Sequence, residues 1–140
     1  MTVEDLRAFL TKHFTLMGER YEVHEVTPTG LTMRLELSGA HERPGGTVSG
    51  PVMMGMVDGA AWLATLSRIG PVELAVTSSL TISFLEKPAL TGELFAHAEL
   101  LRLGRRLSVS DVRLVAHPGD GASPRLVGQA TVTYSIPTAR

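Results

Sequence analysis

A single carboxylate stands against an apolar background in the middle of the chain. Between Pro44 and Ser67, the only charged residue is Asp58. An ionised carboxylate is costly to bury in such surroundings unless it has partners. A carboxylate that loses its hydration in an apolar cleft also becomes a better base. Asp58 is therefore either a chemical group or a polar residue whose hydrogen bonds are satisfied inside a core.

The segment around this carboxylate has the start and stop signals of a helix over residues 51–69. Ser49 is a suitable N-cap, and Pro51 suits the first helical turn. Gly70 stands just past the last turn, as is typical of a helix C-terminus. Apolar side chains occupy every side of this helix, which predicts burial on all sides. Its N-terminus offers the Gly50 N–H to a developing negative charge.

The remaining segments predict a short first helix and a set of antiparallel strands. Thr2 is a suitable cap for a helix that we expect to end near Leu16 to Gly18. Two alternating runs joined by a turn at 28–30 predict a strand pair, and the Gly- and Pro-rich segment over residues 40–50 is expected to be a loop. The four later alternating runs span residues 75–86, 95–104, 107–116 and 125–136. The simplest packing is an α+β fold, one domain over residues 1–140, in which a curved antiparallel sheet wraps a long central helix.

Composition argues against several classes of function. The formal charge is −1 and aromatic residues make up 5%, so neither a basic stripe nor a base-stacking surface for nucleic acid is expected. The chain has no cysteine, which rules out disulfides and thiolate metal sites. Its longest apolar stretch, interrupted by Asp58, is too short to cross a membrane. We expect a cytoplasmic protein with no membrane partner, metal or bound cofactor.

Residues 43–60 carry Gly, Asp and Ala residues at a distinctive spacing. Gly46, Gly50, Asp58 and Ala60 match the motif N-x-x-G-x-x-H-G-G-x-x-x-x-L-x-D-x-A. The stretch thereby resembles the phenylacetate-degradation (PaaI-type) acyl-CoA thioesterases of the hotdog fold. The runs AVTSSLTISFLEKPA and LLRLGRRLSVSDVRL look like that family's central strand and later hairpin. The resemblance therefore extends over nearly the whole chain.

The motif is altered at the residues that flank the start of the long helix. Arg43 replaces the family's Asn, Ser49 replaces its His, and Pro51 replaces its second Gly. Ser49 and Pro51 still form a good helix start, so the backbone geometry can survive. Pro51 has no N–H and cannot donate to an oxyanion, whereas Gly50 can.

The resemblance implies a thioester hydrolase in which Asp58 attacks the carbonyl or activates a water. Gly50 would supply the oxyanion donor, and Thr77 stands where relatives hydrogen-bond the carboxylate or the water. Gly50 and Asp58 are eight residues apart, about 12 Å along one helix, so one carbonyl cannot comfortably reach both in a single chain. Hotdog thioesterases place their sites at dimer interfaces. We therefore expect an obligate homodimer, paired further into a homotetramer.

Several residues are candidates for binding the substrate. Met54 and Trp62 project to the same side of the helix as Asp58 and suit an aryl or short- to medium-chain acyl group. Arg105 and Arg106 follow Gly104 in a hairpin and could meet the phosphates of coenzyme A. The motif positions complete the candidate set, with Arg43, Ser49 and Pro51.

Two other functions remain open at this point. The altered residues at the family's Asn and His positions favour a non-catalytic acyl-CoA or acyl-carrier binding module. A hotdog dehydratase or hydratase pairs a His with an Asp or Glu on this motif, and Ser49 standing at the His position argues against it. Ser49 lies in no G-x-S-x-G elbow, so a helix cap is a better reading than a nucleophile.

Overall fold

Two helices and a large sheet make up the computed structural model, which describes residues 1–13 and 21–138. The helices are α1 (Val3–His13) and α3 (Gly50–Ile69). A 3₁₀ turn, η1 (Gly39–His41), leads into the short strands β3 (Glu42–Arg43) and β4 (Thr47–Val48). The strands of the large sheet are β1 (Glu22–Thr27), β2 (Gly30–Glu36), β5 (Val76–Phe84), β6 (Glu93–Leu103), β7 (Leu107–His117) and β8 (Arg125–Ser135).

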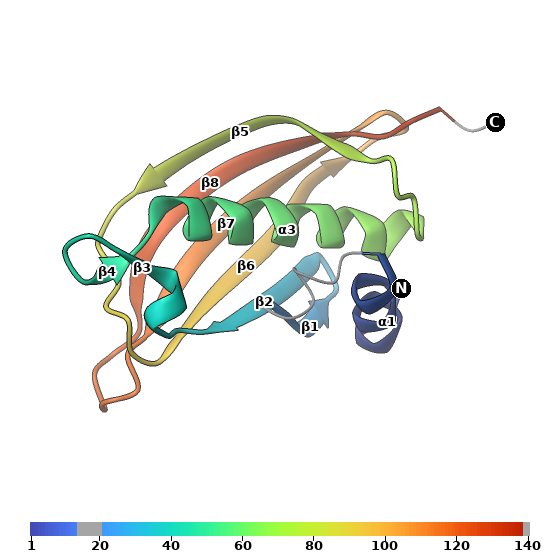
Figure 1. Ribbon diagram of the computed structural model, residues 1–140. Coiled ribbons are helices and arrows are strands. Elements are labelled where there is room, and N and C mark those ends of the chain that lie inside the picture. Colours follow the sequence, from blue (N-terminus) through green and yellow to red (C-terminus); the bar gives the residue numbers. More distant parts are fainter. Residues whose placement is uncertain (14–20, 139–140) are drawn as a thin grey trace.

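The large sheet is antiparallel and curves around α3 (Figure 1). Its strand order is β1-β2-β6-β7-β8-β5, so β5 forms one edge although it follows α3 directly in the chain. The short helix α1 lies beside the C-terminal end of α3 (Figure 1). The predicted α+β hotdog architecture, with a long central helix and a short N-terminal helix, is confirmed.

The ends of α3 are set by the residues that the sequence indicated. The Ser49 side chain accepts a hydrogen bond from the Val52 N–H at 3.3 Å, and Pro51 lies in the first turn. Gly70 ends the helix with a φ of 90°, a left-handed backbone that suits glycine. The predicted helix is thus confirmed, with Gly50 added at its start.

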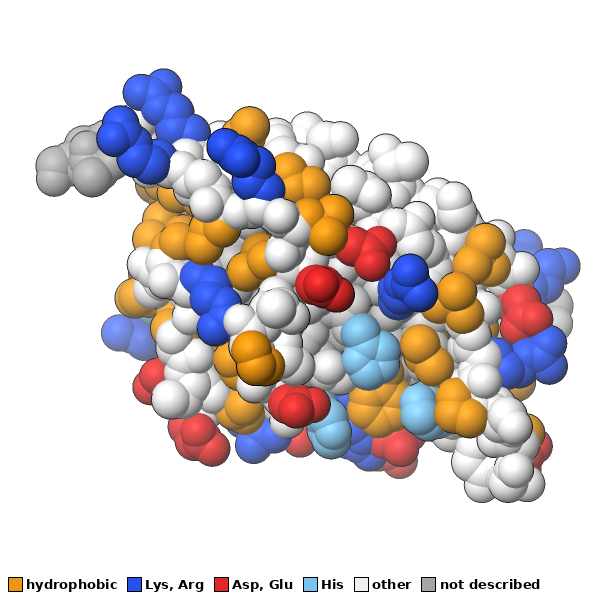
Figure 2. Space-filling model, turned by 180° about the vertical axis from the view of Figure 1, so that it is seen from behind, with side chains coloured by type: hydrophobic (Ala, Val, Ile, Leu, Met, Phe, Trp, Pro, Cys, Tyr) orange, Lys and Arg blue, Asp and Glu red, His pale blue; other side chains and the backbone are white. Residues whose placement is uncertain are grey.

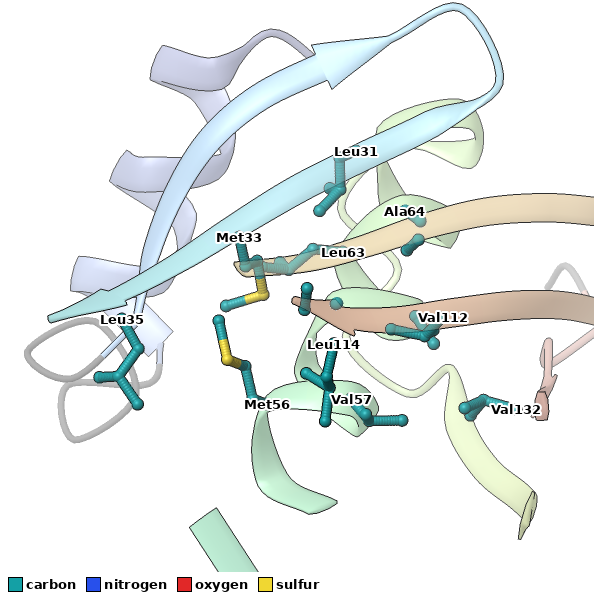
Figure 3. Close-up of a cluster of buried hydrophobic side chains, with 14 of the residues drawn as sticks. Leu31, Met33, Leu35, Met56, Val57, Leu63, Ala64, Val112, Leu114 and Val132 are labelled. Carbon is teal, nitrogen blue, oxygen red and sulfur yellow. The ribbon is translucent and has the colours of Figure 1, made fainter. Parts of the chain in front are cut away.

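The core lies between α3 and the concave face of the sheet. Met56, Val57, Leu63 and Ala64 project from α3 toward strands β2, β7 and β8 (Figure 3). All four side chains are fully buried. Burial of this apolar face supplies the main stabilisation, since each large apolar side chain contributes about 1.5–3 kcal/mol.

Three sequence-based expectations need correction or lie outside the described residues. The helix α3 is not buried on all sides, because Met54 is 39% exposed and Asp58 is partly exposed. The segment expected to be a loop, residues 40–50, contains η1 and the β3–β4 hairpin. The expected end of the first helix near Leu16 to Gly18 falls outside the described residues.

The face of the molecule seen in Figure 2 carries charges of both signs, histidines and several exposed hydrophobic side chains. The Phe95 ring contacts three histidines, with centroid distances of 5.5 Å to His24, 6.1 Å to His97 and 4.6 Å to His117. In the described part of the chain, neither helix has an apolar stretch long enough to span a membrane.

Candidate active site

Two hydroxyl groups converge on the carboxylate of Asp58. Thr77 Oγ1 donates to Asp58 Oδ1 at 2.7 Å, and the Tyr134 hydroxyl donates to the same oxygen at 2.6 Å. The Tyr134 hydroxyl also lies 3.1 Å from the Asp58 backbone carbonyl oxygen. Within the described residues, Asp58 Oδ2 accepts no hydrogen bond. The carboxylate is thus held through one oxygen while the other is open to a reactant.

Strand pairing explains why these groups meet. Thr77 on β5 is the cross-strand partner of Tyr134 on β8, which in turn pairs with Ser108 on β7. Cross-strand partners share one face of a sheet, and here that face is turned toward α3. Ser108 Oγ lies 2.8 Å from the Oγ1 atom of Thr65, seven residues after Asp58 on the helix. A row of hydroxyl groups across three strands thus meets two polar positions on one side of α3.

The tyrosine in this row stays protonated at neutral pH. Tyr134 is only 4% exposed. Burial raises the pKa of its phenol above the ordinary value, and the hydrogen bond to Asp58 raises it further, although the Thr77 hydroxyl opposes the change. Tyr134 is therefore a hydrogen-bond donor to the carboxylate throughout the physiological range.

Asp58 lines a cavity of about 460 Å³. Its walls come from α1, α3, the segment after α3, and the beginning of β5. Phe9 and Trp62 form an apolar wall, with ring centroids 5.6 Å apart. His13 Nε2 lies 3.5 Å from Glu73 Oε1 and links α1 to the segment after α3. The lining residues are Phe9, His13, Asp58, Gly59, Trp62, Glu73, Leu74, Ala75, Val76, Thr77 and Tyr134.

A smaller cavity of about 160 Å³ lies at the N-terminus of α3. It brings Gly50 together with Arg43, Lys87 and Phe84. The Gly50 N–H forms no hydrogen bond within the described residues, so it is available to a ligand. Glu86 also lines this cavity, but its carboxylate is paired with Arg125 at 2.6 and 2.8 Å. The balance of charge and the helix dipole both favour an anionic group here.

The two cavities lie at opposite ends of β5. Thr77 contributes to the first and Phe84 to the second, seven residues or about 23 Å along the strand. The outer edge of β5 has no partner strand within the described chain. Its side chains are mostly exposed, including Val76 at 53% and Phe84 at 50%. Such a long exposed edge, with an apolar side chain at each end, is unusual for a strand that stays unpaired.

The predicted site residues lie at the larger cavity, at the smaller cavity or outside both cavities. Asp58, Thr77 and Trp62 come together at the larger cavity, while Gly50 and Arg43 come together at the smaller one. Ser49 is the helix cap, and Pro51 is exposed beside it.

The predicted pocket role of Met54 is not supported within one chain, because its exposed side chain is not among the residues that line the Asp58 cavity. Arg105 and Arg106 are exposed at the turn between β6 and β7 and line neither cavity. Gly55, on the same helix as Met54, lies against a side chain of this chain, because a Cβ atom there would meet the Tyr21 hydroxyl at 3.0 Å.

Sequence reasoning missed Tyr134 and the contribution of α1. The run TVTYSI indicated a strand, but only the register places Tyr134 opposite Thr77. The apolar spacing in α1 predicted its buried face, and Phe9 is part of that face. The spacing could not show that the same ring would form a cavity wall with Trp62.

Comparisons with known proteins bear on this arrangement. A family model described as Thioesterase superfamily matches residues 45–123. A solved structure from a Silicibacter species, named as a candidate thioesterase, is 36% identical, with a TM-score of 0.84, 98% of this chain covered and 92% of that chain. No curated protein matches the chain.

Two more distant solved structures share the fold. Zebra fish thioesterase superfamily member 2 is 20% identical, with a TM-score of 0.80 over 98% of this chain and 99% of that chain. A mutant of the phenylacetic acid degradation protein PaaI from Thermus thermophilus is 23% identical, with a TM-score of 0.75 over 88% of this chain and 99% of that one. At these identities the likeness establishes the fold alone.

Proposed function

Since the chain belongs to the thioesterase superfamily and is a thioester hydrolase by class, we propose that it hydrolyses an acyl-CoA to CoA and a free carboxylic acid. The observation that carries the proposal is the position of Asp58. Its carboxylate accepts two hydrogen bonds through Oδ1 and none through Oδ2 within the described residues, and Asp58 lines a largely apolar cavity. This is the arrangement that a base or nucleophile acting on a bound acyl group requires.

Two routes use this carboxylate. In the first, Asp58 takes a proton from a water whose oxygen attacks the thioester carbonyl carbon. The C–S bond then breaks, and CoA leaves with that proton. In the second, Asp58 itself attacks, CoA leaves, and water opens the resulting mixed anhydride. Both routes place negative charge on the carbonyl oxygen, and neither uses a metal or a bound redox cofactor.

The oxyanion donor in this proposal is the Gly50 N–H of a second chain. Gly50 and Asp58 are about 12 Å apart along α3, too far for one carbonyl to contact both. Antiparallel pairing of two β5 edges would place the Thr77 end of one chain beside the Phe84 end of its partner. The unfinished edge and the exposed apolar side chains of β5 support such a dimer. A homotetramer built from two dimers remains part of the proposal.

Substrate contacts follow from the two cavities. The wall formed by Phe9 and Trp62 suits an aryl or a short- to medium-chain acyl group. Arg43 lies beside Gly50 and would face the thioester from the partner chain. The predicted contact of Arg105 and Arg106 with CoA phosphates stays a proposal, which a CoA-bound structure would test.

Thioester hydrolysis is tested first by CoA release from short, medium, long and aryl acyl-CoAs, read with a thiol reagent. Asp58→Asn keeps the shape of the side chain and is expected to reduce kcat by about a hundredfold or more. Asp120→Asn makes the same chemical change at an exposed residue between β7 and β8 that lines neither cavity, and it is the control for a surface change. Full activity in Asp58→Asn would overturn the assignment of Asp58.

A shared site is tested by complementation. Gly50→Pro removes the N–H, and Asp58→Asn removes the base. A heterodimer of these two variants, purified through two different tags, would have one site with both defects and one intact site. Such a heterodimer is expected to show about half of the wild-type activity. If each site lies within one chain, the heterodimer is inactive.

The alternative function is a non-catalytic acyl-CoA or acyl-carrier binding module. The observation that favours it is the role of Ser49, which caps α3 at the position where the family motif has His. This function predicts ligand binding, measured by calorimetry, with no CoA release from any substrate. Turnover that depends on Asp58 would exclude it.

A further inference from the structure

Tyr134 makes a contact that a purely structural tyrosine does not need. A buried phenol has to be satisfied by one acceptor, and the Asp58 backbone carbonyl at 3.1 Å would serve. The shorter contact, at 2.6 Å, is instead with the side-chain carboxylate. A hydrogen bond to a charged acceptor is about twice as strong as one to a neutral acceptor. The Tyr134 hydroxyl therefore donates its hydrogen bond mainly to the carboxylate rather than to the backbone carbonyl.

We infer that Tyr134 is a positioning residue that, together with Thr77, fixes Asp58 so that Oδ2 is the reacting atom. This inference rests on the proposed function. A carboxylate oxygen has about two lone-pair sites. Thr77 and Tyr134 occupy both sites on Oδ1. Oδ2 alone is left to accept a proton from water or to attack the carbonyl carbon.

The surroundings of Tyr134 make it a firm support. Its ring is almost fully buried, and its strand is paired on both sides, with β5 and with β7. The Tyr134 hydroxyl also lies within hydrogen-bond distance of the Asp58 backbone carbonyl oxygen. It therefore contacts both the side chain and the main chain of Asp58. Rotation of the carboxylate about χ2 would break two charge-assisted hydrogen bonds at once. These contacts thus fix the orientation of the carboxylate, with Oδ1 engaged and Oδ2 left to react.

The test compares phenylalanine variants of Tyr134 and Tyr21, whose hydroxyl groups both donate a hydrogen bond to a residue of α3. Tyr134→Phe removes only the hydroxyl that reaches Asp58. Tyr21→Phe is the matched control, because the Tyr21 hydroxyl donates to the Val52 carbonyl oxygen at 3.3 Å, on the same helix but away from the carboxylate. Tyr134→Phe is expected to lower kcat by about tenfold to a hundredfold, with KM changed less than about twofold. Tyr21→Phe is expected to keep the wild-type kcat.

A double-mutant cycle that combines Tyr134→Phe with Thr77→Val measures whether the two losses of activity are coupled. A merely structural role of Tyr134 would not produce such coupling. If both hydroxyls hold one oxygen, losing either already frees the carboxylate. The double variant is then expected to lose less activity than the product of the two single losses. Thermal melting checks that each variant is folded.

The outcomes separate this inference from the proposed function. Loss of activity in Asp58→Asn with full kcat in Tyr134→Phe would overturn the inference and leave the proposed function standing. Single losses that multiply in the double variant would also overturn it, since the two hydroxyls would then act independently. Full activity in Asp58→Asn would reject the proposed function itself.

Discussion

The two ends of β5 differ in how complete they are within one chain. At the Thr77 end, the carboxylate has two donors and a buried support, and a cavity of about 460 Å³ opens beside it. At the Phe84 end, the Gly50 N–H and the side chains of Arg43 and Lys87 line a much smaller hollow, and none of these three groups has a hydrogen-bond or ion-pair partner in the part of the chain that the structure describes. The Thr77 end thus holds the charged Asp58 carboxylate, and the Phe84 end is suited to bind a negatively charged group. In the proposed dimer, folding of one chain completes the first end, and association with a second chain completes the other.

The largest effect is expected at the Phe84 end. Gly50→Pro removes the proposed oxyanion donor, and removal of such a donor costs about 10²–10³ in kcat. Gly50→Ala keeps the N–H, and its Cβ would meet Phe84 at 3.7 Å, an ordinary contact. Steady-state kinetics of the two variants isolates the N–H from the added carbon. Equal kcat values for Gly50→Pro and Gly50→Ala would show that the Gly50 N–H is not the oxyanion donor. The proposed difference between the two ends of β5 would then fail.

A smaller effect is expected from the helix cap. Ser49→Ala removes the acceptor of the Val52 N–H and should lower the free energy of unfolding by about 1 kcal/mol. Because the cap is far from Asp58 along α3, we expect oxyanion stabilisation to weaken while the Tyr134 hydrogen bond persists. Urea unfolding gives the stability, and kcat gives the function. An unchanged urea midpoint would contradict the capping role.

The exposed edge offers a test of association alone. Thr81 lies near the middle of β5 and is exposed, so an aspartate there costs little within one chain. Across a two-fold axis, two aspartates would repel, which should weaken the dimer by up to about 1 kcal/mol, or about fivefold in Kd. Thr131→Asp is the matched control, because Thr131 is the partner of Thr81 on β8 and is also exposed.

Sedimentation over a dilution series measures this effect. We expect a larger monomer fraction for Thr81→Asp than for Thr131→Asp, with lower specific activity at low protein concentration. Identical dissociation of the two variants would show that β5 is not the contact edge.

The smallest effect concerns alkaline pH and the Thr77 end alone. Burial raises the pKa of Tyr134 in the folded chain, so above about pH 10 the unfolded chain releases the phenol proton more readily. The free energy of unfolding is therefore constant below that pH for this group and falls as pH rises further, by less than about 1 kcal/mol at pH 10.5. Tyr134→Phe lacks this loss. Urea unfolding between pH 8.5 and 10.5 compares the two slopes, and parallel slopes would contradict the buried phenol.

Local signals in the sequence were enough to predict α3 and to indicate that its carboxylate has hydrogen-bond partners. Ser49, Pro51 and Gly70 mark the helix ends through capping physics that acts over a few residues, and the structure confirms each role. The isolation of Asp58 in an apolar run indicated that it needs partners, and the structure supplies them. Thr77 was anticipated by family resemblance.

Features that depend on strand register and on the free chain surface could not be predicted. Tyr134 meets Asp58 only because β8 pairs with β5 in one register, and a shift of one residue would turn the phenol to the other face. The exposure of Met54 depends on what covers the outer side of α3. An apolar pattern around a helix predicts burial without saying whether the cover belongs to the same chain.

The tie between Asp58 and Tyr134 spans 76 positions along the chain. Contacts of such long range form late, because the closure of a large loop must be offset by other interactions first. During synthesis, α3 emerges well before β8. Asp58 therefore gains its hydrogen bond from Tyr134 only after the last strand has been made. In the proposed mechanism, hydrolytic competence is therefore coupled to completion of the polypeptide, because a chain truncated before β8 would contain Asp58 but lack the phenol that positions it.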